Sequence, residues 1–186
     1  MSAWRPFRPA RGGKVKAVLE PGEVAVLRGV PGMLRPIIEG DLSGNPDAER
    51  LLPSASRDDP KVAAAFREMA QDQLVRAKLD AIDRFEDAIS SPPAGGSSRK
   101  WTQELDAEAI ATWMTVLNDA RLVIGTRLNV TEEIYSDPSD EVFEDPEHYL
   151  YLGLSELLVV LVDAASIAAG RGPARVTRKQ IDEYEG

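Results

Sequence analysis

The sequence contains no cysteine and a single histidine, His148. The lack of cysteine excludes disulfides, zinc–thiolate sites, thiol redox switches and cysteine nucleophiles. One histidine leaves Ser-His-Asp chemistry or a His-rich metal site a single anchor, and no nucleophile motif surrounds it. No Walker sequence is present, and Gly95-Gly96 does not join a strand to a helix start as a phosphate loop does. The sequence therefore predicts a protein that is not an enzyme, without catalytic residues, cofactor or metal site.

Long uncharged apolar runs are also missing. No window reaches the roughly 18 residues of a membrane-spanning helix. The most apolar stretch, Tyr149 to Ala169, carries Glu156 and Asp163, and we interpret it as a buried core helix. Residues 1–13 contain arginines but lack the apolar segment of a secretory signal. We therefore expect a cytoplasmic protein that makes no membrane contact.

Charge is distributed unevenly along the chain. The first 18 residues hold five basic side chains and no acid, and since the whole chain carries −9, the remainder carries −14. The stretch from Glu132 to Glu147 contains eight acidic residues and neither Lys nor Arg. An acidic body repels nucleic-acid phosphate and attracts basic partners, so nucleic-acid binding is limited to weak contact by the basic arm. The simpler alternative is that the acidic stretch is a solvated loop that maintains solubility.

The carboxylates of this stretch are also hard ligands of the kind that calcium or magnesium prefers. The stretch has no glycine and contains Pro138, unlike an EF-hand loop. A metal-dependent enzyme that uses the acidic loop is therefore the least favoured alternative.

The hydrophobic pattern predicts a mainly α fold: a helical domain with long core helices and a small two-stranded β ribbon. Apolar and polar residues alternate over 14–19 and 101–105, which predicts two strands paired with each other. Helices are expected over 21–39, 46–52, 61–90, 106–128 and 146–169. The first should break or kink near Gly29 to Pro31, because proline removes a hydrogen bond from the helix interior.

The same pattern predicts the domain boundaries. Residues 1–13 form a flexible basic arm, and residues 14–170 form one mainly helical domain. Within it, a linker rich in Ser, Pro and Gly covers about 90–100, and the acidic loop covers about 131–146. Residues 171–186 are expected to be a mobile polar tail.

Three residues of the helix over 106–128 form a polar stripe beside its apolar face: Asn118, Arg121 and Gly125. Their spacing of three and four places them, with Met114, on one side of the helix. Arg121 can pair with a carboxylate of another helix, and Gly125 allows that helix to come close. The stripe is either an internal contact that fixes helix register or a groove for a partner. The candidate partner-binding residues are Asn118, Arg121, Gly125, Asp140, Glu141, Glu144 and Asp145.

Several short motifs occur in an order that resembles the actinobacterial AosR family, oxidative-stress regulators formerly grouped as a domain of unknown function. They cover most of residues 12–165. The matching pieces are the basic Gly-Gly arm, Arg50-Leu51-Leu52-Pro53, Arg57-Asp58-Asp59-Pro60, Leu117-Asn118-Asp119-Ala120-Arg121-Leu122, Gly125-Thr126-Arg127-Leu128 and Tyr151-Leu152-Gly153. Gly29, Pro31 and Pro36 depart from the smoother first helix of the family.

The resemblance implies a non-enzymatic cytoplasmic protein that regulates transcription in stress by binding an extracytoplasmic-function sigma factor. The family's redox sensing depends on a cysteine pair, so it does not carry over to this chain. We therefore expect a regulatory protein whose partner is a sigma factor or another basic protein. The alternative from another class is an oligomeric or structural helical protein without a regulatory partner.

Overall fold

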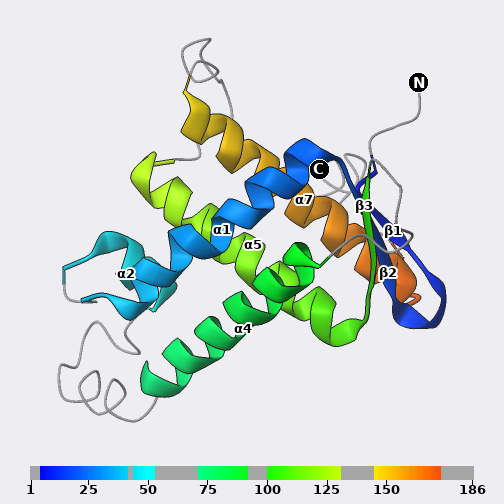
Figure 1. The fold of residues 1–186 in the computed structure, drawn as a ribbon, viewed down its shortest axis with the longest axis horizontal. Coiled ribbons are helices and arrows are strands. Elements are labelled where there is room, and N and C mark those ends of the chain that lie inside the picture. The colour runs from blue at the N-terminus through cyan, green and yellow to red at the C-terminus, as the bar shows by residue number, and fades with distance from the viewer. Residues whose placement is uncertain (1–4, 42–43, 53–70, 92–99, 131–144, 173–186) are drawn as a thin grey trace, which may run out of the picture.

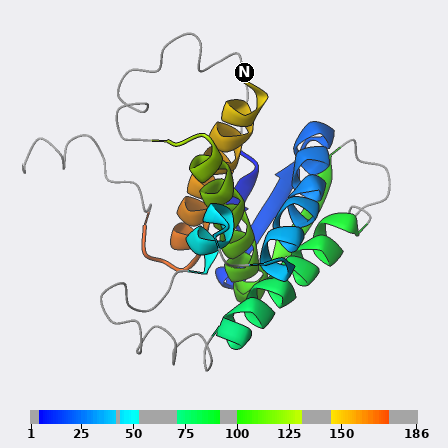
Figure 2. The same cartoon turned by 90° about the vertical axis from the view of Figure 1, so that its left-hand side faces the viewer.

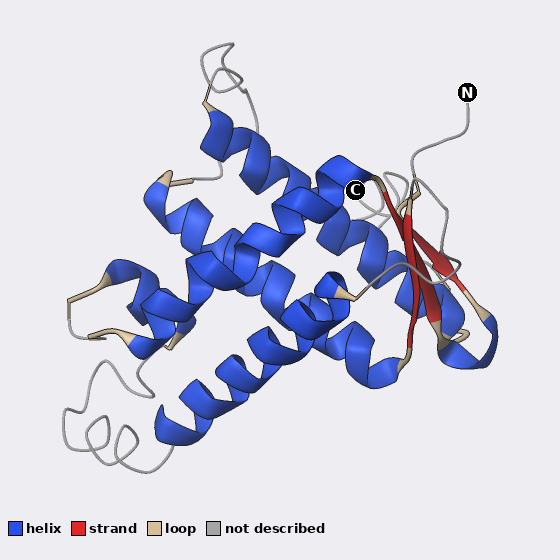
Figure 3. Cartoon of the chain, in the orientation of Figure 1, coloured by secondary structure: helices blue, strands red, loops and turns tan. Residues whose placement is uncertain are grey.

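The structure, a computed structural model, describes residues 5–41, 44–52, 71–91, 100–130 and 145–172. Three antiparallel strands in the order β1-β2-β3 lie at one end of a helical bundle (Figures 1 and 3). The strands are β1 (Phe7–Pro9), β2 (Val15–Leu19) and β3 (Trp101–Leu105). The described helices are α1 (Pro21–Glu39), α2 (Pro46–Leu51), α4 (Asp72–Ser90), α5 (Ala107–Arg127) and α7 (Pro146–Ala168), with a 3₁₀ turn at Arg11–Gly13. The mainly α fold is confirmed.

The two predicted strands are present and paired with each other. Val15 lies opposite Leu105, and Leu19 lies opposite Trp101. The alternation places Val15, Ala17 and Leu19 in the core because successive side chains of a strand point to opposite faces.

The prediction of a two-stranded ribbon is wrong, because residues of the basic arm add a third strand. β1 pairs with β2 from Phe7 opposite Ala17 to Pro9 opposite Val15. Phe7 is buried, and its ring meets Trp113 edge-on at 5.9 Å. This anchor, together with the ladder, holds residues 7–9 in place, so the flexible arm predicted over 1–13 is wrong there. Pro9 fits an edge strand, where a missing N–H breaks no ladder hydrogen bond.

Of the break or kink predicted in the first helix, the break is wrong, since α1 runs through Pro31 and Pro36 without interruption. Proline at position 31 leaves the carbonyl of Leu27 without its helical partner, a cost of about 3 kcal/mol. The side of α1 that faces the core offsets this cost, because tertiary packing decides most helix stability in proteins. Its buried residues are Val24, Leu27, Val30, Pro31, Leu34, Ile37 and Ile38.

Short polar caps fix where the helices begin. Asn45 Oδ1 accepts from the backbone N–H of Asp47 at 3.1 Å, and Asp106 Oδ1 accepts from that of Ala109 at 2.9 Å. Each cap precedes a helix that starts close to the predicted residue. α4 is the described part of the helix predicted over 61–90. The first part of that helix lies outside the described residues, as do 92–99 of the linker and 173–186 of the tail.

Helix α5 occupies the centre of the bundle. α7 packs against one side of it, and α1 and α4 pack against the other (Figure 2). Trp113 of α5 is fully buried, and its ring contacts aromatic rings from three other elements. Its ring centroid lies 4.8 Å from that of Phe85 in α4 and 5.7 Å from that of Trp101 in β3, in addition to Phe7. This cluster joins the sheet to the helices.

Candidate functional site

Two residues of the polar stripe predicted on α5, Asn118 and Arg121, contact each other, but the expected pairing of Arg121 with a carboxylate of another helix is not seen among the described residues. Arg121 Nη2 donates to Asn118 Oδ1 at 3.1 Å, one turn earlier in the same helix. Both side chains are half-buried. Within the described ranges, Arg121 forms no ion pair with a carboxylate of another helix, and its Nε is buried without a hydrogen-bond partner. The contact is internal to α5 and stiffens one turn of that helix.

Gly125 brings α5 and α7 together, as predicted for a close helix contact. A Cβ added at Gly125 would lie 3.1 Å from Cε2 of Tyr151. Tyr151 is a buried residue of α7, so its ring fills the space that glycine leaves open. Gly125 is therefore part of the packing between these two helices, and a larger residue would push Tyr151 away.

Of the predicted acidic candidates, Asp145 is the one that the structure describes. Its Oδ1 accepts from the backbone N–H of Glu147 at 2.9 Å and so caps α7. Its Oδ2 lies 3.3 Å from Nδ1 of His148, which is half-buried beside the cap. Asp145 thus has a structural role at the start of α7. Asp140, Glu141 and Glu144 lie outside the described residues.

No group of three or more His, Asp or Glu side chains that could hold a metal ion occurs in the described part of the chain. Several of the charged side chains described there connect helices instead. Arg35 of α1 reaches Asp83 and Glu86 of α4, with both distances 2.8 Å.

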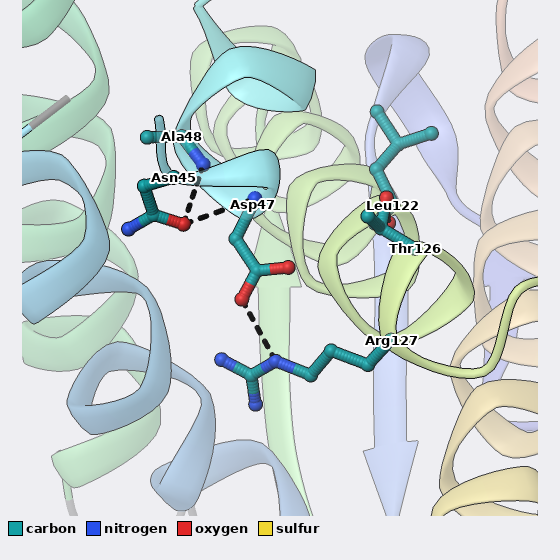
Figure 4. Close-up of polar contacts among 6 residues, drawn as sticks. All are labelled: Asn45, Asp47, Ala48, Leu122, Thr126 and Arg127. Atoms are coloured by element: carbon teal, nitrogen blue, oxygen red, sulfur yellow. Dashed lines mark hydrogen bonds and ion pairs between the residues drawn. The ribbon is translucent and has the colours of Figure 1, made fainter. Parts of the chain in front are cut away.

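A similar ion pair joins the short helix α2 to the end of α5. Arg127 Nε donates to Asp47 Oδ2 at 2.8 Å, next to the Asn45 cap (Figure 4). Thr126 Oγ1 donates back to the carbonyl of Leu122, a bond within α5. These contacts hold α2 against α5 and mark this corner of the bundle as structural.

A buried ion pair that was not predicted from the sequence joins α4 to α5. Lys78 Nζ lies 2.6 Å from Asp119 Oδ2, and the two side chains are 11% and 8% exposed. Burial raises the pKa of Asp119, and the hydrogen bond from Lys78 opposes that rise without cancelling it. Asp119 directly follows Asn118 of the predicted stripe. A carboxylate between the core residues Leu117 and Ala120 was the signal that could have pointed to it.

The raised pKa of Asp119 predicts how stability depends on pH. Because the folded-state pKa lies above the ordinary value of 3.8, the folded chain holds this proton more tightly than the unfolded chain does. The resulting stability is fully present below the unfolded-state pKa and is lost as pH rises through the folded-state pKa. Urea unfolding of wild type and Asp119→Asn from about pH 3.5 to 7 measures it. The wild-type advantage should be largest at the lowest pH, whereas an advantage that grows with pH would contradict the prediction.

Helix α7 differs most from its prediction as a buried core helix. One side of it is buried, but on the opposite side Tyr149 is 58% exposed and Ile167 is 46% exposed. Leu152 and Val159 between them are each 39% exposed. By length and composition, α7 is the one helix in the described ranges that could span a membrane. Only 28% of its most apolar 18-residue stretch is buried inside the fold. α7 therefore presents an apolar surface that the rest of the described fold does not cover.

A family model described as a domain of unknown function, DUF2017, matches residues 1–165. No curated protein and no solved structure matches the chain.

Proposed function

This chain belongs to the DUF2017 family, and we propose that it is a non-enzymatic cytoplasmic protein that acts by binding a basic protein partner. The observation that carries the proposal is the exposed apolar side of α7, set in a strongly acidic part of the chain. Residues 128–170 hold ten acidic side chains and neither Lys nor Arg. Exposed apolar surface supplies affinity, and acidic side chains near it in the sequence favour basic partners.

The resemblance to the AosR family supports a narrower form of the same proposal. In this form the partner is a sigma factor or another component of the transcription machinery, since such proteins carry basic nucleic-acid-binding surfaces. The outcome would be transcriptional regulation in stress. Because the chain has no cysteine, oxidant does not switch the complex through a thiol of this chain.

The acidic stretch is expected to accelerate association more than it strengthens the final complex. Charges at the rim of an interface act on diffusional encounter, and salt screens them over about 10 Å at 0.1 M and about 3 Å at 1 M. The variant Asp140→Asn/Glu141→Gln/Glu144→Gln removes three negative charges. It retains Asp145, because loss of that cap would disturb α7 itself. We expect a lower on-rate, a weaker salt dependence and a nearly unchanged off-rate.

Stopped-flow association with a partner purified from the native cell measures these rates. The matched control is Glu39→Gln/Glu49→Gln/Asp80→Asn, which removes three exposed acids from α1, α2 and α4. It should leave the salt dependence close to that of wild type. Equal on-rates for all three proteins across salt would mean that the acidic stretch only maintains solubility. Tight sequence-specific DNA binding by the protein alone would contradict the proposed function.

A further inference from the structure

A surface away from the exposed side of α7, on the hairpin formed by β1, the turn at Arg11–Gly13 and β2, has an unusual arrangement of charge. Arg8 lies directly opposite Lys16 in the register of the two strands. Opposite residues of an antiparallel pair point to the same face of the sheet, with their Cβ atoms about 5 Å apart. Lys14 shares this outer face, because residues two apart along a strand lie on one side. All three side chains are exposed, as is that of Arg11 at the turn, and we call these four residues the basic hairpin.

The basic hairpin has little acidic compensation. Within the described ranges, Arg8, Arg11 and Lys16 form no ion pair, either across the sheet or with α7, which packs against β1 and the turn. Lys14 Nζ lies 3.7 Å from Oε2 of Glu104 in β3, and both side chains are about half exposed. Like charges directly opposite each other destabilise a strand pair. Arg8 and Lys16 therefore weaken the hairpin that carries them.

We propose that the basic hairpin binds the phosphates of a nucleic-acid backbone and does not read the sequence of the bases. Arg and Lys side chains form charge-assisted hydrogen bonds with phosphate oxygens. A phosphate bound between Arg8 and Lys16 would offset the repulsion between these two cations. The inference goes beyond the proposed function, because it concerns a different surface and does not depend on the protein partner.

The chemistry of the hairpin favours phosphate over an acidic protein. Protein interfaces depend on apolar anchors, and none of the large apolar side chains that the described fold exposes belongs to the hairpin. Phe7, the one aromatic residue of the segment 5–16, is buried, so no ring of this segment is available to stack on a base. Contact with phosphates needs charge alone and is independent of sequence.

The tip of the hairpin is open to a ligand. Gly12 and Gly13 have φ values of 70° and 75°, in the left-handed region that glycine favours. A Cβ added at either residue would meet no atom within 4 Å. The turn therefore places no side chain between Arg11 and Lys14 that would keep a phosphate backbone away.

The acidic remainder of the chain weakens this contact but does not prevent it. The hairpin lies at the end of the helical bundle opposite α2 (Figures 1 and 3). Salt screens charges over about 10 Å at 0.1 M, so nearby cations act on a bound phosphate more strongly than distant carboxylates do. We therefore expect weak, salt-sensitive binding.

The test is fluorescence anisotropy of a DNA duplex of about 20 base pairs titrated with the full chain. Three phosphate contacts, from Arg8, Arg11 and Lys16, predict an affinity that falls about 40-fold between 50 and 200 mM salt. Arg8→Gln/Lys16→Gln leaves one contact, so its affinity should fall only about fourfold over the same range. Its melting temperature should equal or exceed that of wild type, because the like-charge pair is removed. Unchanged DNA binding with a lower melting temperature would give the pair a structural role and overturn the inference.

Two further variants locate the binding on the hairpin. Arg50→Gln/Arg76→Gln removes two exposed cations from α2 and α4 and should keep the salt dependence of wild type. An equal loss of salt dependence in this variant would show that net charge acts instead of the hairpin, and would overturn the inference. Glu104→Gln removes the acid that pairs with Lys14 and should strengthen DNA binding severalfold. Weaker binding of Glu104→Gln would contradict the inference.

Other polyanions distinguish the possible ligands. A second duplex of different sequence should bind equally well. Polyglutamate and phosphatidylcholine/phosphatidylglycerol vesicles should bind about tenfold more weakly, because duplex DNA carries one charge per about 1.7 Å of its axis. Equal or tighter binding of polyglutamate would make the hairpin a surface for acidic proteins, and equal or tighter binding of the vesicles would make it a lipid surface. Either result, or a tenfold preference for one duplex sequence, would overturn the inference.

Discussion

Replacing Asp119 with alanine is expected to lower the free energy of unfolding by about 3–5 kcal/mol at pH 7. Asp119 and Lys78 are both almost fully buried, and their charged atoms lie 2.6 Å apart. Alanine removes the hydrogen-bond acceptor as well as the charge, so the Lys78 ammonium is left buried without any partner. Protonation of Asp119 at low pH removes only the charge and keeps an acceptor oxygen beside Lys78. Because α4 is held to α5 at this point, the variant should also expose the first turns of α4 to proteolysis.

The double variant Lys78→Met/Asp119→Leu distinguishes a buried charge from a loss of packing. It replaces both charged groups with apolar side chains of similar size, a change that is often neutral or stabilising. Urea unfolding should therefore place it near wild type and well above Asp119→Ala. A loss below about 1 kcal/mol for Asp119→Ala would show that the pair is solvated and exchangeable, as surface ion pairs are.

Replacing Trp113 with alanine is expected to lower the free energy of unfolding by about 3–5 kcal/mol. Trp113 is fully buried, and its ring contacts the rings of Phe7, Phe85 and Trp101. The cavity would remove the common neighbour of α4, β1 and β3, so the sheet should lose its anchor on α5. Amide hydrogen exchange should show β1 opening first, because it is short and lies at the edge.

Trp113→Phe is the matched control for this second substitution. It keeps an aromatic ring at the centre of the cluster and should cost clearly less than alanine. If the two variants unfold at the same urea concentration, or if alanine costs under about 1 kcal/mol, the cluster does not hold the sheet as described.

The features that the sequence predicted correctly are local ones. The alternation over 15–19 and 101–105 and the caps Asn45, Asp106 and Asp145 depend on residues within one turn or one strand. A side chain that accepts from a backbone N–H two or three residues later acts in the same way in any tertiary setting. These signals located the start of α2, α5 and α7 and the pairing of two strands.

The features that the sequence did not reveal depend on residues far apart in the chain. Phe7 joins the core because Trp113 lies opposite it, and no local pattern shows this. Pro31 stays within α1 because the rest of that helix face is buried, an outcome that tertiary packing decides against local propensity.

The candidate site shows the same division between local and distant signals. The spacing on α5 correctly predicted that Gly125 admits a neighbouring helix, because Tyr151 of α7 packs there. It misplaced the ion pair, which Asp119 forms and Arg121 does not, since both lie near the apolar face and only the position of α4 decides between them. The exposed side of α7 did have a signal in the sequence. Glu156 and Asp163 lie seven residues apart on the side of the helix opposite its buried residues.

We propose that this protein binds a basic protein through the exposed apolar side of α7, which lies in an acidic part of the chain. The most direct measurement is isothermal titration calorimetry of the full chain with a partner purified from the native cell, repeated at several temperatures and salt concentrations. We expect saturable binding with a negative heat-capacity change, because apolar surface is buried, and an affinity that falls as salt rises. Leu152→Ser/Val159→Ser/Ile167→Ser should reduce both the affinity and the heat-capacity change. A salt-independent affinity with no heat-capacity change in wild type, or the absence of any protein that binds, would overturn the proposed function.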